Sequence, residues 1–276
     1  MQAFVELMKE HIKNWEVFYS AGRIYEERKY GVEANLQKSI EFYEIAAKSN
    51  QVRVLDRLAD LSYITGNNSL AEKYAKKALQ INPTLVSAKI TLASALSQRV
   101  IFTSECEEAL KLFNELSAMS YSQFEDYRTP AYFCYCAARI FDKKEEWVNE
   151  NKKIEWCVRG AMVAANYPND SYGVSCCGAA IPLLQKHSKF KQVIELCILY
   201  KKRYIVADWL LGYAYCRGHQ VPKDFNKGAE CFLSVINNYN HLTDKVYQDK
   251  RNDAQIALSK MTCNNGIWKK KMFESI

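Results

Sequence analysis

The sequence predicts an all-α fold, a right-handed α-solenoid of about seven antiparallel helix pairs. Three observations lead to this prediction. One helix–loop–helix pattern occurs twice, at residues 19–47 and 209–236. Apolar and small residues recur at three- and four-residue spacing along most of the chain, as on one face of a helix. Of the 276 residues, 49% are hydrophobic but only 10 are Gly and 5 are Pro, which suits a long helical array better than two globular domains.

The two copies share a common frame over both helices and the loop between them. Self-similarity in units of about 30 to 40 residues is typical of stacked helix pairs, because no single pair can bury its apolar face alone. The first copy carries one extra loop residue. The aligned positions are Gly22, Tyr25, Val32, Asn35, Lys38 and Tyr43 in the first copy, and Gly212, Tyr215, Val221, Asp224, Lys227 and Phe232 in the second.

The second copy has the local chemistry of a tight reversal between two helices. Gly212 lies in mid-helix, where glycine costs up to about 1 kcal/mol relative to alanine, so we expect it to let the partner helix approach closely. Gly218 is typical of a helix end, and Pro222 prevents the helix from continuing. Asp224 is a good N-cap for the helix that begins at Phe225.

These residues resemble the Sel1-like repeat, a relative of the tetratricopeptide repeat. The best matches are residues 15–50 and 207–240, and residues 52–85 resemble a tetratricopeptide repeat. The first copy departs from the pattern, because Arg28 and Ser39 stand where glycine and alanine are usual. The second copy keeps the pattern at Ala207, Leu211, Gly212, Tyr215, Gly218, Val221, Asp224, Lys227 and Ala229.

We expect residues 1–262 to form one repeat domain that ends in a capping helix, because the terminal unit of an array has no neighbour to cover its core. Pro182 lies in an otherwise helical stretch, so a kink or break is expected near Cys177 to Ile181. Residues 263–276 are a basic tail, for which two interpretations stay open. Disorder is favoured, and a docking peptide that contains Trp268 is the alternative.

The resemblance implies a non-enzymatic adaptor or scaffold that binds a partner protein or peptide in the concave groove of the array. In such arrays the first helix of each pair lines the groove, and aromatic and arginine side chains are enriched in binding hot spots. The alternative role of the same side chains is packing between units. The candidate groove residues are Tyr19, Arg23, Arg53, Asp56, Asp60, Tyr63, Trp209, Tyr213 and Arg217.

The basic excess of the chain belongs to its last third. Residues 1–185 have a net charge of −1, whereas residues 186–276 have a net charge of +8. Lysines that solvate helix ends explain this most simply, and a surface for an acidic protein, a nucleic acid or an anionic membrane is the functional alternative. The candidate basic patch consists of Lys186, Lys189, Lys191, Lys201, Lys202, Arg203, Lys269, Lys270 and Lys271.

Two further functions compete with the adaptor. An immunity or inhibitor protein would neutralise one dedicated toxin or effector through a very tight complex. A nucleic-acid-binding protein would use the basic last third, although no RNP, KH or zinc-knuckle pattern supports this alternative. An acidic protein surface ranks ahead of RNA as the partner of the basic patch.

Catalysis and cofactor binding find little support in the sequence. It contains no phosphate-binding loop, dinucleotide fingerprint, HExxH helix or GxSxG elbow, so we expect no enzyme and no cofactor. Most of the ten cysteines lie on apolar helix faces, which favours core packing over a zinc site or a redox switch. No stretch is long and apolar enough to span a bilayer and the N-terminus lacks a signal-peptide core, so a cytoplasmic location is expected.

Overall fold

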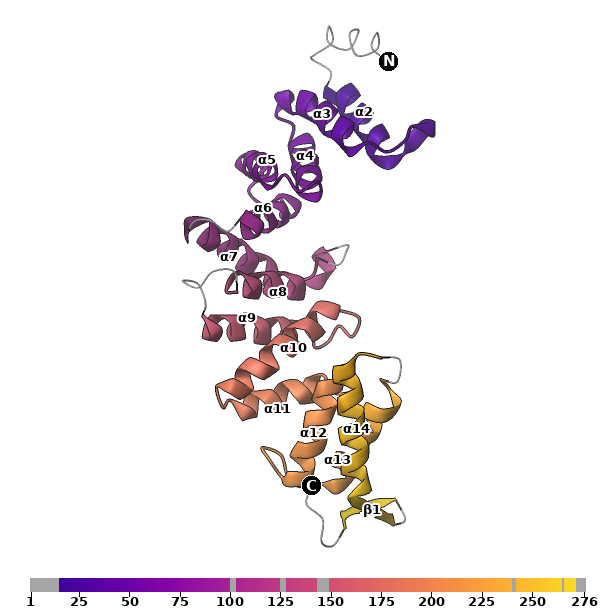
Figure 1. Cartoon of the computed structure of the whole chain (residues 1–276). Coiled ribbons are helices and arrows are strands. Elements are labelled where there is room, and N and C mark those ends of the chain that lie inside the picture. Colours follow the sequence, from indigo (N-terminus) through magenta and orange to yellow (C-terminus); the bar gives the residue numbers. More distant parts are fainter. Residues whose placement is uncertain are drawn as a thin grey trace. The chain divides into compact units, whose positions relative to one another are not determined.

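The computed structural model describes residues 15–99, 103–124, 128–142, 149–239, 242–264 and 266–271. The chain divides into two compact units, Met1–Leu116 and Ser117–Ile276, which we describe separately. In the described ranges the chain is helical apart from turns, loops and one two-stranded hairpin (Figure 1). The predicted all-α fold is confirmed.

The first unit consists of successive helix pairs. Within each of the first two pairs the helices pack against each other, and α6 packs on both helices of the second pair. An ion pair of 2.7 Å between Lys89 Nζ and Glu115 Oε2 joins α6 to α7. The helices are α2 (Trp15–Glu27), α3 (Leu36–Ala46), α4 (Val52–Ile64), α5 (Asn68–Ile81), α6 (Val86–Arg99) and α7 (Thr103–Ser117).

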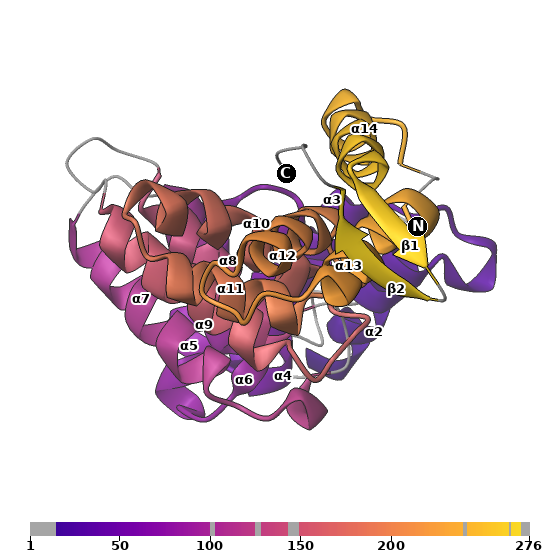
Figure 2. The same ribbon diagram turned by 90° about the horizontal axis from the view of Figure 1, so that it is seen from below.

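The second unit continues with three pairs, a final helix and the hairpin. In both views the yellow α14 and hairpin lie beside α13 (Figures 1 and 2). Counting the described residues of both units, six pairs precede α14. The elements are α8 (Pro130–Ile140), α9 (Glu150–Val163), α10 (Ser171–Lys186), α11 (Phe190–Leu199), α12 (Ile205–Arg217), α13 (Phe225–Asn237), α14 (Lys245–Ser259), β1 (Met261–Asn264) and β2 (Ile267–Lys270).

The two sequence copies fold in the same way at the loop between their helices. The backbone N–H of Asn35 donates to Tyr25 O, and that of Asp224 donates to Tyr215 O, both at 2.9 Å. Each of these two residues then caps the second helix, because its side-chain oxygen accepts the N–H three residues later, at 2.9 Å and 3.0 Å. The N-cap predicted at Asp224 is confirmed, and the extra loop residue of the first copy does not change this closure.

Glycine at equivalent positions of the two copies lets an aromatic ring lie against the first helix. A Cβ added to Gly22 would lie 2.5 Å from Tyr43 Cε1, and one added to Gly212 would lie 2.4 Å from Phe232 Cε1. Both rings are fully buried. The close approach predicted for Gly212 is therefore confirmed, and Gly22 has the same role.

The first helix of each copy ends in a left-handed residue. Gly218 has φ of 72°, as expected for a glycine helix stop. Arg28, which occupies the equivalent position of the first copy, also adopts the left-handed region with φ of 55°. The departure from the family pattern at this position thus changes the residue but keeps the backbone conformation.

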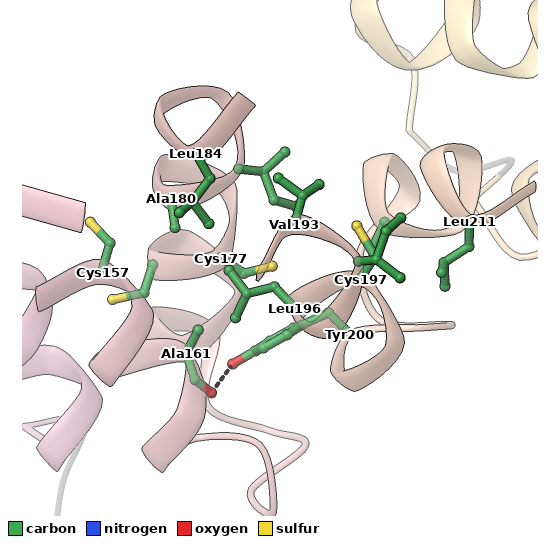
Figure 3. Packing of buried hydrophobic residues seen from close by; sticks show 14 of the residues in the cluster. Cys157, Ala161, Cys177, Ala180, Leu184, Val193, Leu196, Cys197, Tyr200 and Leu211 are labelled. Carbon is green, nitrogen blue, oxygen red and sulfur yellow. Dashed lines mark hydrogen bonds between the residues drawn. The ribbon is translucent and has the colours of Figure 1, made fainter. Parts of the chain in front are cut away.

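One buried cluster of the second unit combines aliphatic residues, small residues and thiols with the ring of Tyr200. Tyr200 is fully buried, and its hydroxyl donates to Ala161 O at 2.8 Å, which joins α9 to the end of α11 (Figure 3). Around it, Cys177, Cys197 and Ala180 are also fully buried. Thiols occupy alanine-sized positions here, as the sequence predicts.

Two expectations about irregular segments need correction. The helix α10 contains Pro182 and continues from Ser171 to Lys186, so of the kink or break expected near Cys177 to Ile181 the break is absent. At the start of the basic tail, the strands Met261–Asn264 and Ile267–Lys270 pair as an antiparallel hairpin. The hairpin is held on the second unit because Trp268 packs against the buried cluster formed by residues of α12, α13 and α14, which we call the α12–α14 core. Its backbone N–H also donates to Asn226 Oδ1 at 2.7 Å. Residues 1–14 and 272–276 lie outside the described residues.

Candidate protein-interaction surface

The nine candidate groove residues lie on first helices of three pairs. Tyr19 and Arg23 are on α2, four residues are on α4, and Trp209, Tyr213 and Arg217 are on α12. The α2 and α4 residues belong to the first unit and the α12 residues to the second. The structure therefore describes two candidate surfaces, one in each unit.

In the first unit, an arginine and a tyrosine join neighbouring first helices. The guanidinium of Arg53 lies over the ring of Tyr19, 4.9 Å from its centroid, and its Nε donates to the Tyr19 hydroxyl at 3.1 Å. The same ring contacts Trp15 edge-on and Tyr43 at a tilt. Because Arg53 is exposed and sits on an aromatic ring, it has the character of a binding hot spot.

A charged cluster continues this surface along α2 and α4. Arg57 forms an ion pair with Glu26 of α2 and another, at 2.9 Å, with Asp60 of its own helix. The buried Tyr43 hydroxyl donates to the same Glu26 carboxylate at 2.8 Å. We call Tyr19, Arg23, Glu26, Arg53, Arg57 and Asp60 the α2–α4 face.

Arg23 lies at the edge of the α2–α4 face in a local ion pair. Its Nε donates to Glu27 at 2.6 Å, and this hydrogen bond is the main reason why the pKa of Arg23 is raised. Hydrogen bonds from Lys29 and then from Arg23 lower the pKa of Glu27. Both side chains stay accessible, so this pair positions a charge at the surface and adds little stability.

Two other candidates on α4 have different surroundings. Asp56 accepts a hydrogen bond of 2.7 Å from Ser87 Oγ, which joins α4 to α6. This contact gives Asp56 a packing role between neighbouring first helices. Tyr63 is half-buried near the end of α4, and Asp60 is engaged by Arg57.

Sequence reasoning missed Arg57 as a candidate. The signal that could have found it is its spacing, because Arg57 lies one turn after Arg53 and residues four apart share a helix face. Its partner Glu26 occupies the facing position on α2.

In the second unit, the aromatic candidates of α12 face the protein's own final helix. Lys250 of α14 places its ammonium 3.4 Å from the centroid of the Trp209 ring. Tyr213 lies edge-on to the buried Phe232 and edge-on to Trp209. These rings belong to the α12–α14 core, where the sequence analysis expected a ligand.

One pocket opens beside these residues. It has a volume of about 350 Å³ and lies between α10, α11 and α12. Arg217, whose guanidinium lies 5.2 Å from the centre of the Tyr213 ring, is at this pocket. We call it the α11–α12 pocket, and its lining residues are Gln185, Phe190, Val193, Ile194, Leu210, Tyr213, Ala214, Arg217, Gly218 and His219.

The Sel1 repeat model matches residues 19–51 and 205–234, which contain most of α2 with α3, and α12 with most of α13. Each of these two segments is therefore similar to a Sel1 repeat, and we refer to them by that name. The equivalent loop closures, capping contacts and glycine–aromatic contacts described above are thus shared by the two matched segments. No curated protein sequence matches the chain.

Two solved structures are similar to the chain at low identity. One is a protective antigen present in uropathogenic Escherichia coli strains that displays an SLR fold, with 18% identity over 88% of this chain and a TM-score of 0.38. The chain spans 57% of the length of that protein. The other is a Sel1 repeat protein from Oxalobacter formigenes, with 18% identity, a TM-score of 0.39, and coverage of 84% of this chain and 90% of that one.

The basic patch does not form one continuous surface around the C-terminal Sel1 repeat. Lys186 ends α10, Lys189 and Lys191 lie at the start of α11, and Lys201, Lys202 and Arg203 follow the end of α11. A ten-residue helix separates the last two groups by about 15 Å. Lys269 and Lys270 are exposed on β2, and Lys271 donates to Ser259 O.

Several members of the basic patch already have partners within the chain. Lys186 pairs with Glu150 at 2.6 Å, and Lys201 pairs with Glu230 at 3.0 Å. Arg203 donates to the carbonyl of Ala165 at 3.0 Å and lies over a buried ring. For these residues the structure favours a stabilising role over a binding role.

Most thiols of α8 to α13 are buried. Burial raises the pKa of Cys134 and Cys157 to about 11, and that of Cys177 and Cys231 to about 12. Among the described residues, no group of three or more His, Cys, Asp or Glu side chains is placed to hold a metal ion. No helix in the described ranges is long and apolar enough to cross a membrane.

Proposed function

We propose that this protein is a non-enzymatic adaptor that binds a partner protein through the first helices of its repeat array. The α2–α4 face carries the proposal. It combines an exposed arginine stacked on Tyr19, a second arginine held by two carboxylates, and a neighbouring tryptophan. Arginine and aromatic side chains held in fixed positions are the residue types that dominate binding energy in protein interfaces.

The geometry of this face supports a partner with both apolar and carboxylate groups. The ring of Tyr19 and the guanidinium of Arg53 are already ordered by their mutual contact, so little conformational entropy is lost when a partner binds. The guanidinium keeps N–H donors for a carboxylate after its Nε bonds to the tyrosine. An acidic or amphipathic protein segment would satisfy both groups.

The nucleic-acid alternative has less support. Lys186, Lys201 and Lys202 are close to carboxylates of the chain, and the basic residues lie at opposite ends of α11. Nucleic-acid binding needs several cations that follow one backbone and weakens steeply with salt. Binding of bulk RNA with such a salt dependence would favour this alternative over the adaptor.

Partner capture with matched surface variants tests the adaptor. The full-length protein, tagged and expressed in the cells it comes from, is purified with its bound proteins, and the partner is then titrated in purified form. Arg53→Ala and Arg57→Ala should each weaken the complex by about tenfold or more. Glu41→Ala, an exposed residue on the second helix α3, is the control and should leave affinity unchanged.

Two results would contradict the proposal. One is that no protein co-purifies in stoichiometric amount. The other is that a genuine partner binds both arginine variants as tightly as it binds Glu41→Ala. The variants must first show the same thermal unfolding as the unaltered protein, because loss of the Arg57–Glu26 ion pair can also lower stability.

A further inference from the structure

The α11–α12 pocket has an apolar interior of aliphatic residues. Val193 and Ile194 of α11 are 3% and 7% exposed, and Ala214 of α12 is 5% exposed. Leu210 of α12 completes the aliphatic part of the lining. At about 350 Å³, the pocket has room for one large apolar side chain.

Two aromatic lining residues of this pocket, Phe190 and His219, contact each other, and we refer to them as its mouth. Phe190, at the start of α11, lies edge-on to His219 in the loop after α12, with ring centroids 5.4 Å apart. Arg217 and Gly218 complete this side of the pocket. This ring contact links the start of α11 to the loop after α12.

A basic hollow adjoins the pocket at Phe190. It has a volume of about 390 Å³, and Phe190 lines both cavities. Lys189 and Lys191 line the hollow together with Ser188, Gln192 and Gln220. No Asp or Glu lines either cavity, so carboxylates brought by a ligand would meet no repulsion from the lining.

The carboxylate that contacts the residues just before Lys189 is already engaged. Glu150 accepts from Lys186 at 2.6 Å and contacts His187 Nε2 at 2.8 Å. Within the described part of the chain, neither Lys189 nor Lys191 forms an ion pair. An apolar cavity and a positively charged hollow therefore lie side by side, with charge left to complement an anion.

We propose that the α11–α12 pocket binds an acidic peptide segment of a partner protein, with one large apolar side chain in the pocket and flanking carboxylates at Lys189, Lys191 and Arg217. The proposal rests on the adaptor function and adds a second surface, in the other unit of the chain, with a defined partner chemistry. A nucleic acid fits less well, because the polar edges of a base would lose their hydrogen bonds among Val193, Ile194 and Leu210.

Fluorescence anisotropy with synthetic peptides tests this site in the full chain. The probes are fluorescein-labelled acidic decapeptides with a central Leu, Ile or Phe, and each has a counterpart with central Ala and another with Asn and Gln in place of the acids. At least one apolar acidic peptide should bind saturably, and both kinds of replacement should weaken binding about tenfold. A labelled RNA decamer should bind more weakly and should not compete.

Protein variants locate the binding. Phe190→Asp places a carboxylate at the mouth and should abolish measurable binding, whereas Phe190→Leu, its matched control, should keep affinity within about threefold. Lys191→Glu should weaken binding about tenfold. Lys245→Glu, an exposed lysine at the N-terminus of α14, should not change it. Circular dichroism checks that Phe190→Asp folds, and Lys191→Glu serves as the test if it does not.

The pocket proposal and the adaptor proposal can fail independently, because they are tested by different experiments. If none of the acidic peptides binds saturably up to millimolar concentration, or if Ala peptides bind as well as Leu, Ile and Phe peptides, the pocket proposal is overturned. If RNA competes for the site, the occupant is a nucleic acid and the proposal is likewise overturned. Loss of a captured partner in Arg53→Ala would still support the adaptor in either case.

Discussion

Gly22 and Gly212 determine how closely the two helices of a Sel1 repeat approach each other. In both repeats a ring from the second helix occupies the space where a Cβ would be. The ring itself is fully buried, so it cannot move outward without losing its contacts. A single hydrogen atom in place of a side chain is therefore required twice, at positions 190 residues apart in the chain.

Replacing Gly212 tests this requirement. Gly212→Ala places a methyl group 2.4 Å from Phe232 Cε1, so we expect the free energy of unfolding to fall by about 1 to 3 kcal/mol, despite the better helix propensity of alanine. Urea denaturation measures the change. Adding Phe232→Leu to Gly212→Ala should cost less than the sum of the two single changes, because leucine leaves room for the methyl group. Strictly additive effects would show that the contact does not limit packing.

At the level of elements, a buried carboxylate connects the end of α11, α12 and α13. Asp208 is fully buried in the first turn of α12. It accepts the backbone N–H of Lys202 at 2.9 Å, the Ser234 hydroxyl at 2.8 Å and the Tyr239 hydroxyl at 3.0 Å. Lys202 has a left-handed φ of 64°, and the Asp208 bond stabilises this turn.

Removing this carboxylate should loosen the C-terminal Sel1 repeat. Asp208→Ala leaves two buried hydroxyls and the partly buried N–H of Lys202 without their acceptor, and we expect a loss of about 3 kcal/mol in the free energy of unfolding. Tyr239→Phe removes one donor and should cost about 1 kcal/mol. Thermal and urea unfolding measure both. In the Asp208→Ala background, Tyr239→Phe should cost almost nothing, and an unchanged cost there would show that the two residues are not coupled.

The elements whose contacts lie within one repeat could be predicted from the sequence. The Asp224 cap and the Gly212 contact depend on residues fewer than about 30 positions apart, and each has a local physical signature. The hairpin also had a signal that was not used, because Asn-Gly at positions 265 and 266 is typical of a two-residue hairpin turn. Tail composition alone gave the less accurate expectation of disorder.

Contacts between distant elements could not be predicted in this way. Lys250 lies over Trp209 because α14 packs beside α12. The sequence of α14 is rich in charged residues and has no pattern that predicts which of its side chains would face α12. Phe190 of α11 meets His219 of the loop after α12, and helical periodicity gives no information on such a contact. Of the three candidates on α12, Trp209 lies against Lys250 of α14, whereas Tyr213 and Arg217 line the α11–α12 pocket.

At the scale of the whole molecule, buried thiols make stability depend on pH in the alkaline range. Burial raises the pKa of Cys134, Cys157 and Cys216 from an ordinary value of 9.0 to about 11. Between these values the unfolded chain has released the thiol proton and the folded chain has kept it. The unfolded state gains the free energy of ionisation, so stability is lost as pH rises.

We therefore expect the free energy of unfolding to fall between about pH 9 and pH 11, by roughly 1.4 kcal/mol per pH unit for each such thiol at most. Denaturation at a series of pH values measures the slope. A variant with Cys134, Cys157 and Cys216 replaced by Ala should show a shallower slope in the same interval. An identical slope would assign the pH dependence to other groups, such as the buried tyrosines.

The packing of α14 on the aromatic side of α12 has a consequence for how such a chain can change in length. Trp209 and Tyr213 pack against the buried cluster that α12 shares with α13 and α14, and Lys250 of α14 lies over the Trp209 ring. An additional helix pair could therefore stack on this side of α12 only if α14 were displaced.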